Sequence, residues 1–307
     1  MTSPPLREEA PPLVPRAAVW HQAVLGWYDE HARDLPWRQV DVTPWGVLVS
    51  EAMLQQTPVA RVLPAWEEWL TRWPTPTALA ATSPGEAVRA WGRLGYPRRA
   101  LRLHEAATII RDRHAGAVPA NVEALRALPG VGAYTAAAVT VFAYGQRRPV
   151  LDINVRRVLA RAGAGRARPG MAPTRDERLL AETMLPNGAL VGLAPRWSVA
   201  VMELGALVCT ARAPRCGQCP LRPECAWVAA GQPMPASGRR RGQTWEGTDR
   251  QARGRLLAVL RECPDPVPIA RLDAAWPVTA QRQRALHGLV ADGLVEPVGP
   301  DLFALPS

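Results

Sequence analysis

Polar and apolar positions follow a helical pattern over most of the chain. From Val19 to Ala230, apolar residues recur three and four positions apart, and proline or glycine interrupts them at intervals. No clean alternation of the kind that marks a half-buried strand occurs before residue 290. The pattern predicts an all-α core of roughly 210 residues, which is long enough to bury a sizeable interior.

The composition changes at both ends of this core. Residues 1–18 are rich in proline and predict a disordered leader, whereas residues 230–248 combine glycine, proline, serine and arginine and predict a linker. Residues 249–307 predict three helices followed by two extended stretches around a turn, at Asp249–Cys263, Ile269–Trp276, Ala280–Asp292 and on either side of Gly299–Asp301. This order resembles a small winged helix-turn-helix domain of α+β type. A helical packing module that does not touch DNA is the alternative.

The charge of the chain indicates a polyanionic partner. Thirty-seven arginines and no lysines stand against twenty-seven acidic residues, and the net charge is +10, as expected of a protein that handles nucleic acid. We find no apolar run approaching the length of a membrane span and no targeting pattern, so we expect a cytoplasmic protein without membrane contact. Without lysine, only the N-terminal amine could form a Schiff base, which excludes lysine-dependent strand cleavage.

Four of the five cysteines lie close together in the spacing C-x6-C-x2-C-x5-C, at Cys209, Cys216, Cys219 and Cys225. Loops this short would gain little from disulfides, so we interpret the four thiolates as ligands of one metal centre. Zinc ribbons usually present two C-x2-C pairs and this chain has one, so the spacing favours a [4Fe-4S] cluster while zinc stays the alternative. Cys263 lies elsewhere and is expected to be a buried apolar thiol.

The segment LPGVGAYT, residues 128–135, separates two helical patterns, the first of which opens at Asn121 as its N-cap. It is typical of a helix-hairpin-helix. Gly130 and Gly132 let the backbone approach a ligand closely, and amides at the N-terminus of the second helix can bind a phosphate without reading a base. The expected DNA-binding residues of this turn are Gly130, Val131 and Gly132. A tight turn without a ligand is the alternative, and the basic charge of the chain favours DNA.

Two carboxylic acids are candidates for catalysis. Asp152 precedes a helical stretch that ends at Gly163 and can cap it, where the helix dipole favours the ionised form by about 0.3 to 1 kcal/mol. Glu51, in SEAMLQQT, has apolar neighbours at helical spacing, so we expect desolvation to raise its pKa; a surface helix glutamate is the alternative. One raised and one ionised carboxylate form the pair that cleaves a glycosidic bond, and here the glycoside would be a nucleoside.

Six segments and the cysteine spacing together resemble one family. The segments are LPWR (35–38), SEAMLQQT (50–57), WGRLGY (91–96), LPGVGAYT (128–135), VLDINV (150–155) and ELGALVC (203–209). With them, residues 20–229 are similar to the adenine DNA glycosylases of the MutY type, in the helix-hairpin-helix superfamily that includes endonuclease III. The resemblance implies a glycosylase core at residues 19–229, with a six-helix module at about 40–148 and an iron-sulfur subdomain formed by the N-terminal helix and residues 149–229.

The resemblance also implies an activity. Such an enzyme flips adenine out of a pair with 8-oxoguanine or guanine in double-stranded DNA and hydrolyses its N-glycosidic bond. By matching position, Glu51 would protonate the adenine, and Asp152 would stabilise or trap the oxocarbenium-like sugar, with Tyr134 and Asn154 in support. Endonuclease III-like members place a nucleophilic lysine where Tyr134 stands. We therefore expect a monofunctional glycosylase that leaves the abasic site intact.

Further positions match residues that contact DNA. Arg38 and Glu203 correspond to positions near the flipped base, with an ordinary ion pair as the alternative. Another group corresponds to residues that wedge into the duplex or sense the opposite base, namely Gln56, Thr57, Leu94 and Tyr96. Packing in the helical core is the alternative for Leu94 and Tyr96.

The family's [4Fe-4S] cluster, which the four cysteines would hold, supports DNA binding and does not react with the substrate. Many members end in a Nudix-like domain that helps recognise 8-oxoguanine. Residues 249–307 are too few for that domain, so we expect a weaker preference for 8-oxoguanine over guanine. We also expect a monomer.

Two other functions stay open at this point. A thymine or uracil mismatch glycosylase shares the hairpin, the aspartate and the cluster, although SEAMLQQT and LPWR favour adenine. An iron-sulfur DNA-binding regulator would account for a winged helix beside a redox-sensitive cluster. It gives no reason for Glu51, Asp152 and the hairpin to occur together.

Overall fold

The computed structural model describes residues 13–233 and 246–307 of the chain. Most of the predicted leader (1–12) and most of the predicted linker (234–245) therefore lie outside the described residues. Helix α1 spans Leu13–His31, so the last six residues of the predicted leader are helical. A proline-rich start is compatible with a helix, because the N–H groups of the first helical turn make no intrahelical hydrogen bonds and proline lacks only this group.

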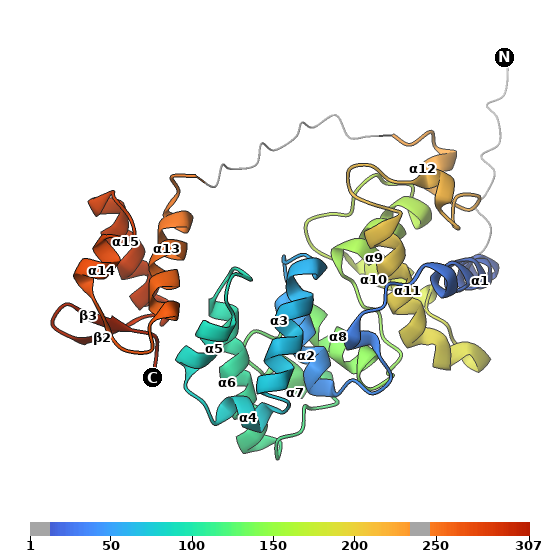
Figure 1. Ribbon diagram of the computed structural model, residues 1–307. Coiled ribbons are helices and arrows are strands. Elements are labelled where there is room, and N and C mark those ends of the chain that lie inside the picture. The colour runs from blue at the N-terminus through green and yellow to red at the C-terminus, as the bar shows by residue number, and fades with distance from the viewer. Residues whose placement is uncertain (1–12, 234–245) are drawn as a thin grey trace. The chain divides into compact units, whose positions relative to one another are not determined.

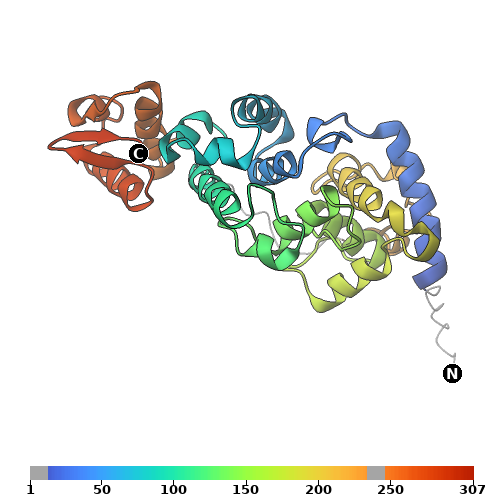
Figure 2. The same ribbon diagram turned by 90° about the horizontal axis from the view of Figure 1, so that it is seen from below.

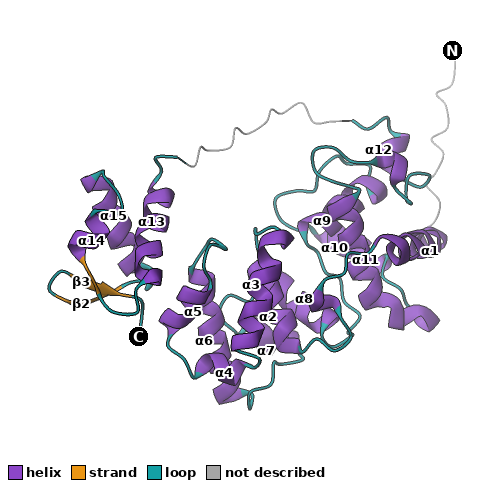
Figure 3. Ribbon diagram, viewed as in Figure 1, coloured by secondary structure: helices purple, strands orange, loops and turns teal. Residues whose placement is uncertain are grey.

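The described chain is mainly helical, as the apolar periodicity predicts (Figure 1; Figure 3). The helices after α1 are α2 (Pro44–Leu54), α3 (Val59–Arg72), α4 (Pro76–Ala80), α5 (Pro84–Ala90), α6 (Arg98–Arg113), α7 (Val122–Arg126), α8 (Ala133–Phe142), α9 (Ile153–Val158), α10 (Arg175–Thr183), α11 (Ala194–Leu207) and α12 (Ala226–Ala229). Short 3-10 turns are η1 (Pro36–Arg38), η3 (Gly188–Leu193) and η4 (Cys216–Gln218), and η2 (Leu159–Gly163) is a π-helical turn.

The chain divides into two compact units. Unit 1 combines the segment that ends at Asp34 with Thr140–Ser237, and unit 2 combines Leu35–Val139 with Gly238–Ser307. Each unit is thus built from two stretches that are far apart in the sequence, and the division falls within α8.

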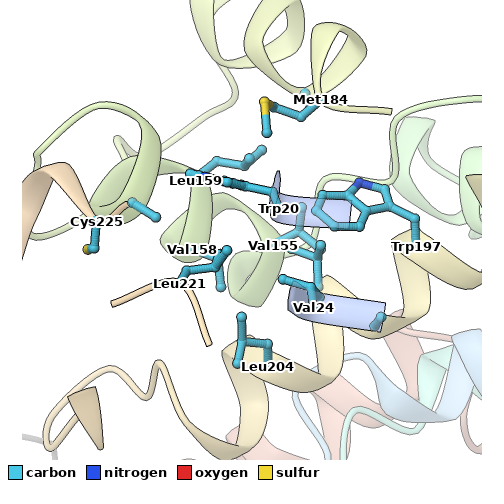
Figure 4. Packing of buried hydrophobic residues seen from close by; sticks show 14 of the residues in the cluster. Trp20, Val24, Val155, Val158, Leu159, Met184, Trp197, Leu204, Leu221 and Cys225 are labelled. Carbon is cyan, nitrogen blue, oxygen red and sulfur yellow. The ribbon is translucent and has the colours of Figure 1, made fainter. Parts of the chain in front are cut away.

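The core of unit 1 forms where α11 packs against α1 and α9 (Figure 2). Apolar side chains from these helices and from the cysteine-containing loop meet there, including Trp20, Val155, Trp197, Leu204 and Leu221 (Figure 4). Because α9 begins one residue after Asp152, this core fixes the direction in which that helix starts. The candidate aspartate therefore lies at the edge of a helix that packs into this core.

The helical stretch that ends with α11 is more apolar than the sequence pattern predicts. Among the described residues, the 20-residue helical stretch Gly188–Leu207 is long and apolar enough to cross a membrane by length and composition. The expectation that no apolar run approaches the length of a membrane span is wrong by this criterion. Arg196 and Glu203 interrupt the stretch but lower its mean hydropathy only a little. The α11 part of this stretch buries eight of its residues within unit 1, as the core helix of a globular protein does.

Unit 2 contains helices α2–α7 around a core rich in tryptophan. Trp69 makes edge contacts with Trp73 and Trp91, at centroid separations of 4.7 and 5.6 Å. The Trp45 indole donates to the Trp73 carbonyl at 3.0 Å, and that of Trp66 donates to Gly46 at 2.8 Å. These large rings hold α2, which carries Glu51, against α3.

The rest of unit 2 is a small C-terminal domain with three helices and a sheet (Figure 2). Its elements are α13 (Asp249–Glu262), β1 (Val267–Pro268), α14 (Ile269–Asp273), α15 (Thr279–Ala291), β2 (Glu296–Gly299) and β3 (Leu302–Ala304). The predicted helices and hairpin are confirmed, although α14 ends three residues early. The sequence analysis missed β1, which pairs antiparallel with β3 in a sheet of order β1-β3-β2, because two residues show no periodicity.

Candidate active site

Asp152 caps the N-terminus of α9 in unit 1. Its Oδ1 accepts a hydrogen bond from the Val155 backbone N–H at 2.6 Å, and its Oδ2 accepts one from the Asn154 amide Nδ2 at 2.6 Å. The predicted capping role is confirmed. Both carboxylate oxygens are held by neighbours in the same turn, so the group has a fixed orientation.

The protonation of Asp152 differs from the sequence expectation. Burial raises the pKa of the Asp152 carboxyl above its ordinary value, against the lowering effect of the Val155 and Asn154 donors and of the nearby Arg157 charge. The earlier expectation considered the helix dipole and omitted the loss of water around the carboxyl. A carboxylate that has lost solvent attracts a nearby cation more strongly than one in water.

Arg157 connects the Asp152 turn with the first cysteine. It is buried, and it donates to Asn154 Oδ1 at 2.7 Å, to the Gly205 carbonyl at 2.6 Å and to the Cys209 carbonyl at 2.6 Å. The sequence analysis missed this residue. Consecutive arginines in a helix usually mark a solvated face, and only the packing of α9 against α11 reveals that this one points inward.

Gly205 allows α11 to approach the start of α9 closely. A Cβ atom at this position would lie 2.7 Å from the Asn154 carbonyl oxygen and 2.8 Å from Asn154 Cβ, closer than side-chain carbons come. The glycine in ELGALVC therefore determines how near the two helices lie. Any side chain here would move the turn that holds Asp152.

Glu203 forms a bidentate ion pair with Arg33. Its carboxylate is fully buried and accepts from Arg33 Nε at 2.6 Å and from Nη2 at 2.7 Å, and the Arg33 backbone N–H lies 3.1 Å from Oε1. These hydrogen bonds raise the pKa of Arg33. The sequence analysis considered Arg38, in η1 of unit 2, as the basic partner and missed Arg33, which lies five residues earlier in the chain.

The four clustered cysteines line one cavity in unit 1, together with Arg161, Leu221 and Trp227. Figure 4 shows Leu221 beside Val158 of α9, and Cys225 belongs to the same cluster of buried residues. No group of three or more His, Cys, Asp or Glu side chains in residues 13–233 or 246–307 is close enough to hold a single metal ion. Four thiols around one cavity are the donor set that a [4Fe-4S] cluster uses, and zinc can use the same donors.

The surroundings of the sulfurs also suit such a centre. Burial raises the pKa of Cys219 to about 12, so a metal would have to displace its proton. Arg161 Nη1 lies 3.4 Å from Cys209 Sγ, and Gln232 Nε2 lies 3.2 Å from Cys216 Sγ. N–H donors of this kind stabilise cluster thiolates. Cys263, outside the group, is buried as predicted.

Glu51 lies on α2 of unit 2 and is 6% exposed. Its immediate helix is almost entirely buried, from Trp45 to Met53, and begins with Thr43 as an N-cap. The alternative of a surface glutamate is wrong. The Glu51 carboxyl is thus buried, as the prediction of a general acid requires.

The hairpin of unit 2 follows the predicted arrangement with one correction. Asn121 caps α7, and Gly130 has a φ of +79°, which explains the need for glycine in this turn. The Val131 backbone N–H donates to the Leu128 carbonyl at 3.2 Å, so it belongs to the turn and is not available as a phosphate donor. A Cβ at Gly132 would meet open space, and Tyr134 is partly exposed in the first turn of α8.

Gln56 and Tyr96 meet at the surface of unit 2. The Tyr96 hydroxyl donates to Gln56 Oε1 at 2.8 Å, and both residues have positive φ, +48° and +60° respectively. Left-handed backbone at two non-glycine residues is strained and often marks a binding site. Leu94 is buried, as its packing alternative expects, and insertion into a duplex would require it to leave this position.

Arg99 holds the two turns that carry this pair and was missed by the sequence analysis. It is 9% exposed and donates to Thr57 Oγ1 at 3.1 Å, the Gly95 carbonyl at 3.0 Å and, in α2 and its end, the carbonyls of Ala52, Met53 and Gln55. Thr57 is itself buried and donates to the Leu94 carbonyl at 3.1 Å. Nothing in the local pattern of WGRLGYPRRA separates this arginine from its exposed neighbour.

Comparison with known proteins places these observations in a family. The model of the HhH-GPD superfamily base excision DNA repair proteins matches residues 49–181. An adenine DNA glycosylase of Mycobacterium tuberculosis is 56% identical over 284 residues, 92% of this chain and 92% of that protein. A thymine-DNA glycosylase of Aeropyrum pernix is 34% identical over 68% of this chain and 94% of its own length.

Among solved structures, a thermostable thymine-DNA glycosylase is similar with a TM-score of 0.63 and 26% identity, over 70% of this chain and 98% of that one. The structural likeness covers the helical core, and the similarity to the mycobacterial protein extends over most of the chain. With its helical fold, its hairpin and this identity over nearly the whole length, the chain belongs to the adenine DNA glycosylase family of the HhH-GPD superfamily.

Proposed function

We propose that this protein hydrolyses the N-glycosidic bond of adenine in double-stranded DNA, where the adenine is mispaired with 8-oxoguanine or guanine, as the first step of base excision repair. The observation that carries the proposal is the 56% identity to an adenine DNA glycosylase over 92% of both chains. The net charge of +10 supports DNA as the partner.

In the proposed reaction, Glu51 and Asp152 have different roles. Glu51 donates a proton to a ring nitrogen of the flipped adenine, and the electron pair of the C1′–N9 bond moves into the base as that bond breaks. The sugar is left as an oxocarbenium-like cation, which the Asp152 carboxylate stabilises in its poorly solvated position. Water then adds to C1′, and its proton returns to Glu51.

The remaining site residues have supporting roles. Asn154 orients the Asp152 carboxylate through its 2.6 Å hydrogen bond, and Tyr134 contacts the substrate from the start of α8. Arg38 and Glu203 contribute to binding the flipped base. The opposite strand is contacted by Gln56 and Tyr96, by the turn around Thr57 and Leu94, and by the hairpin at Gly130–Gly132.

The absence of lysine leads us to propose a monofunctional enzyme. With tyrosine at position 134, no side-chain amine can attack C1′ and start elimination of the strand. The expected product is an intact abasic site. Prompt strand cleavage without added base or heat would contradict this.

A [4Fe-4S] cluster held by Cys209, Cys216, Cys219 and Cys225 is part of the proposal. Proteins of this family commonly carry such a cluster. When bound, such a cluster would tie together the loop between the first and last cysteine, and the exposed Arg212 and Arg215 of that loop would contact phosphates. We propose that the protein acts as a monomer on nucleoid DNA in the cytoplasm, and that residues 19–229 and 249–307 form a glycosylase core and a winged-helix-like domain.

The first test is single-turnover base release from four duplexes, containing A:8-oxoguanine, A:G, G:T and G:U. We expect adenine release alone, slowed about 10²- to 10⁴-fold in Glu51→Gln and strongly in Asp152→Asn. Release of thymine or uracil would instead support a mismatch glycosylase, which the likeness to the Aeropyrum pernix protein favours as the second candidate. No release from any duplex would overturn the proposal.

A second test separates binding from chemistry. We expect Cys216→Ser to weaken duplex binding by more than it slows adenine release at saturating enzyme, because the cysteine loop supports DNA contacts. Affinity is measured by a binding titration on a duplex with a non-hydrolysable adenosine analogue. A variant that binds normally and reacts slowly would contradict the proposed role of the cluster.

A further inference from the structure

The C-terminal domain contacts α5 and the start of α6 within unit 2. The Gly85 backbone N–H donates to the Pro306 carbonyl at 2.7 Å, and Arg261 Nε donates to the Val88 carbonyl at 2.9 Å. Arg98, the first residue of α6, lies 3.2 Å from Asp292 at the end of α15. Three separate elements of the small domain thus contact one face of the six-helix module.

The fit at this contact is close. A Cβ on Gly85 would lie 2.5 Å from the Pro306 carbonyl oxygen and 3.0 Å from Leu305 Cβ, so glycine is the residue that permits the contact. Leu305 and Pro306 are buried. Burial also lowers the pKa of Arg261 to about 10, because the guanidinium has lost much of its water. The domain is therefore seated on α5 by desolvated groups and not by exposed ion pairs alone.

The docked position brings Arg250 to the Gln56–Tyr96 pair. Arg250 lies in the first turn of α13, and its Cζ is 5.1 Å from the centroid of the Tyr96 ring. The same ring lies 5.5 Å from Arg99 Cζ, and its hydroxyl holds Gln56. Tyr96 is 46% exposed and has left-handed backbone, and the guanidinium of Arg250 contacts its ring together with Arg99 and Gln56.

We propose that Arg250 is a positioning residue for Tyr96 and, through it, for Gln56, so that the C-terminal domain helps set the preference for the base opposite the adenine. This inference rests on the proposed function. A cation over an aromatic face is attracted by the ring, and the attraction grows when the site is desolvated, as it would be beneath a bound duplex. The domain thus acts on specificity through a residue of the catalytic module.

The first test replaces Arg250 by glutamine. We expect the ratio of single-turnover rates on A:8-oxoguanine and A:G to change about three- to tenfold, with partial recovery in Arg250→Lys, which keeps a cation at the ring. On a duplex with an abasic analogue opposite the adenine, Arg250→Gln should match the native protein, because no opposite base is present. Arg255→Gln, an exposed change on the same helix, is the control and should leave the ratio unchanged.

The second test examines the route of the effect. In a Tyr96→Leu background, Arg250→Gln should have no further effect on the ratio. Gly85→Ala, which favours the helix but obstructs Pro306, should reproduce the Arg250→Gln result. Gly254→Ala places a methyl group in open space on α13 and serves as its control.

Particular outcomes would overturn the inference. Arg250→Gln could slow adenine release equally from all duplexes, including the one with the abasic analogue. Alternatively, it could change the rate ratio as much in the Tyr96→Leu background as in the native protein. Either result would show that Arg250 acts on DNA binding or folding in general. The ratio of affinities for the A:8-oxoguanine and A:G duplexes can be compared between native protein and Arg250→Gln even if the native protein releases no adenine. Absence of adenine release would therefore contradict the proposed function without deciding the role of Arg250.

Discussion

Units 1 and 2 both use buried arginines to hold functional turns, but the turns differ in what else stabilises them. In unit 1, Arg157 and Arg161 donate to carbonyls around Cys209, in a loop whose cysteines line a cavity. In unit 2, Arg99 joins the end of α2 to the turn before α6, beside a core of packed tryptophans. In unit 1 the proposed cluster would add to these contacts, whereas the contacts described for the turns of unit 2 are between protein groups.

The two catalytic candidates follow the same division. Glu51 lies within a helix that is buried by apolar packing, so its surroundings come from tertiary contacts of α2. Asp152 lies at a helix end, where hydrogen bonds from its own turn and from Asn154 orient it. Both carboxyls are buried, but Asp152 is in addition oriented by hydrogen bonds within its own turn, and we expect changes in one unit to leave the carboxyl of the other intact.

The largest effect is expected for Arg99→Ala in unit 2. The change removes a buried cation that donates to at least five oxygens, so we expect the free energy of unfolding to fall by about 3 kcal/mol or more. Urea unfolding measures this, with the exposed Arg113→Ala as the control. The iron content should not change. A loss below about 1 kcal/mol would show that Arg99 is not the main link between the two turns.

Arg161→Leu is the matching change in unit 1. Arg161 is 2% exposed, donates to the Thr210 carbonyl at 2.7 Å and lies over the Trp227 ring. Residues that hydrogen-bond to metal ligands typically contribute 10- to 100-fold to metal affinity. We therefore expect Arg161→Leu to lower the affinity for the proposed cluster by about 10- to 100-fold. Iron per chain and the visible absorbance report it. If Arg99→Ala lowered the iron content as much, the distinction between the units would be lost.

Two glycine substitutions sharpen the comparison further. Gly205→Ala should cost about 1–3 kcal/mol in unfolding free energy, because its Cβ would meet the Asn154 backbone. Gly132→Ala meets open space and should change stability by less than about 0.5 kcal/mol. It should nevertheless weaken duplex binding, since the added methyl group would lie between the hairpin and a phosphate. Equal stability losses in both variants would contradict this reading of the two sites.

The smallest effect is a dependence of stability on pH. Because burial raises the pKa of Asp152 in the folded state, its ionisation at neutral pH opposes folding. The favourable contribution is fully present below the unfolded pKa of about 3.9 and is lost as the pH rises through the folded pKa. Asp152→Asn keeps an N-cap and removes the charge. We expect a higher Tm for this variant at pH 8, with a gain that shrinks as the pH falls through the folded pKa. A gain that grew towards acid pH would mean that the pKa is lowered instead.

A related change tests the hydrogen bond from Asn154. This donor lowers the pKa of Asp152, so Asn154→Ala should raise it further. If, as proposed, adenine release depends on the carboxylate form, the acid-side decline of its rate should move to higher pH. Single-turnover rates across pH measure the shift. A decline at unchanged pH, with only a lower plateau, would mean that Asn154 positions Asp152 without affecting its protonation.

The sequence by itself determined the parts of this protein that depend on local pattern. Helical periodicity predicted the helical core and the three C-terminal helices. The caps at Asn121 and Asp152 and the turn glycine Gly130 also followed from local chemistry, because each bond closes within three or four residues. The prediction of a metal centre also came from local spacing, because the four cysteines lie within seventeen residues of the chain.

Only the tertiary structure decided which polar residues are buried together. Arg33, Arg99 and Arg157 look like ordinary surface arginines in the sequence, and their partners lie on other segments. The raised pKa of Asp152 and the contact between Arg250 and Tyr96 likewise depend on segments brought together by folding. Desolvation and long-range hydrogen bonds are properties of packed surfaces, and no local pattern records them.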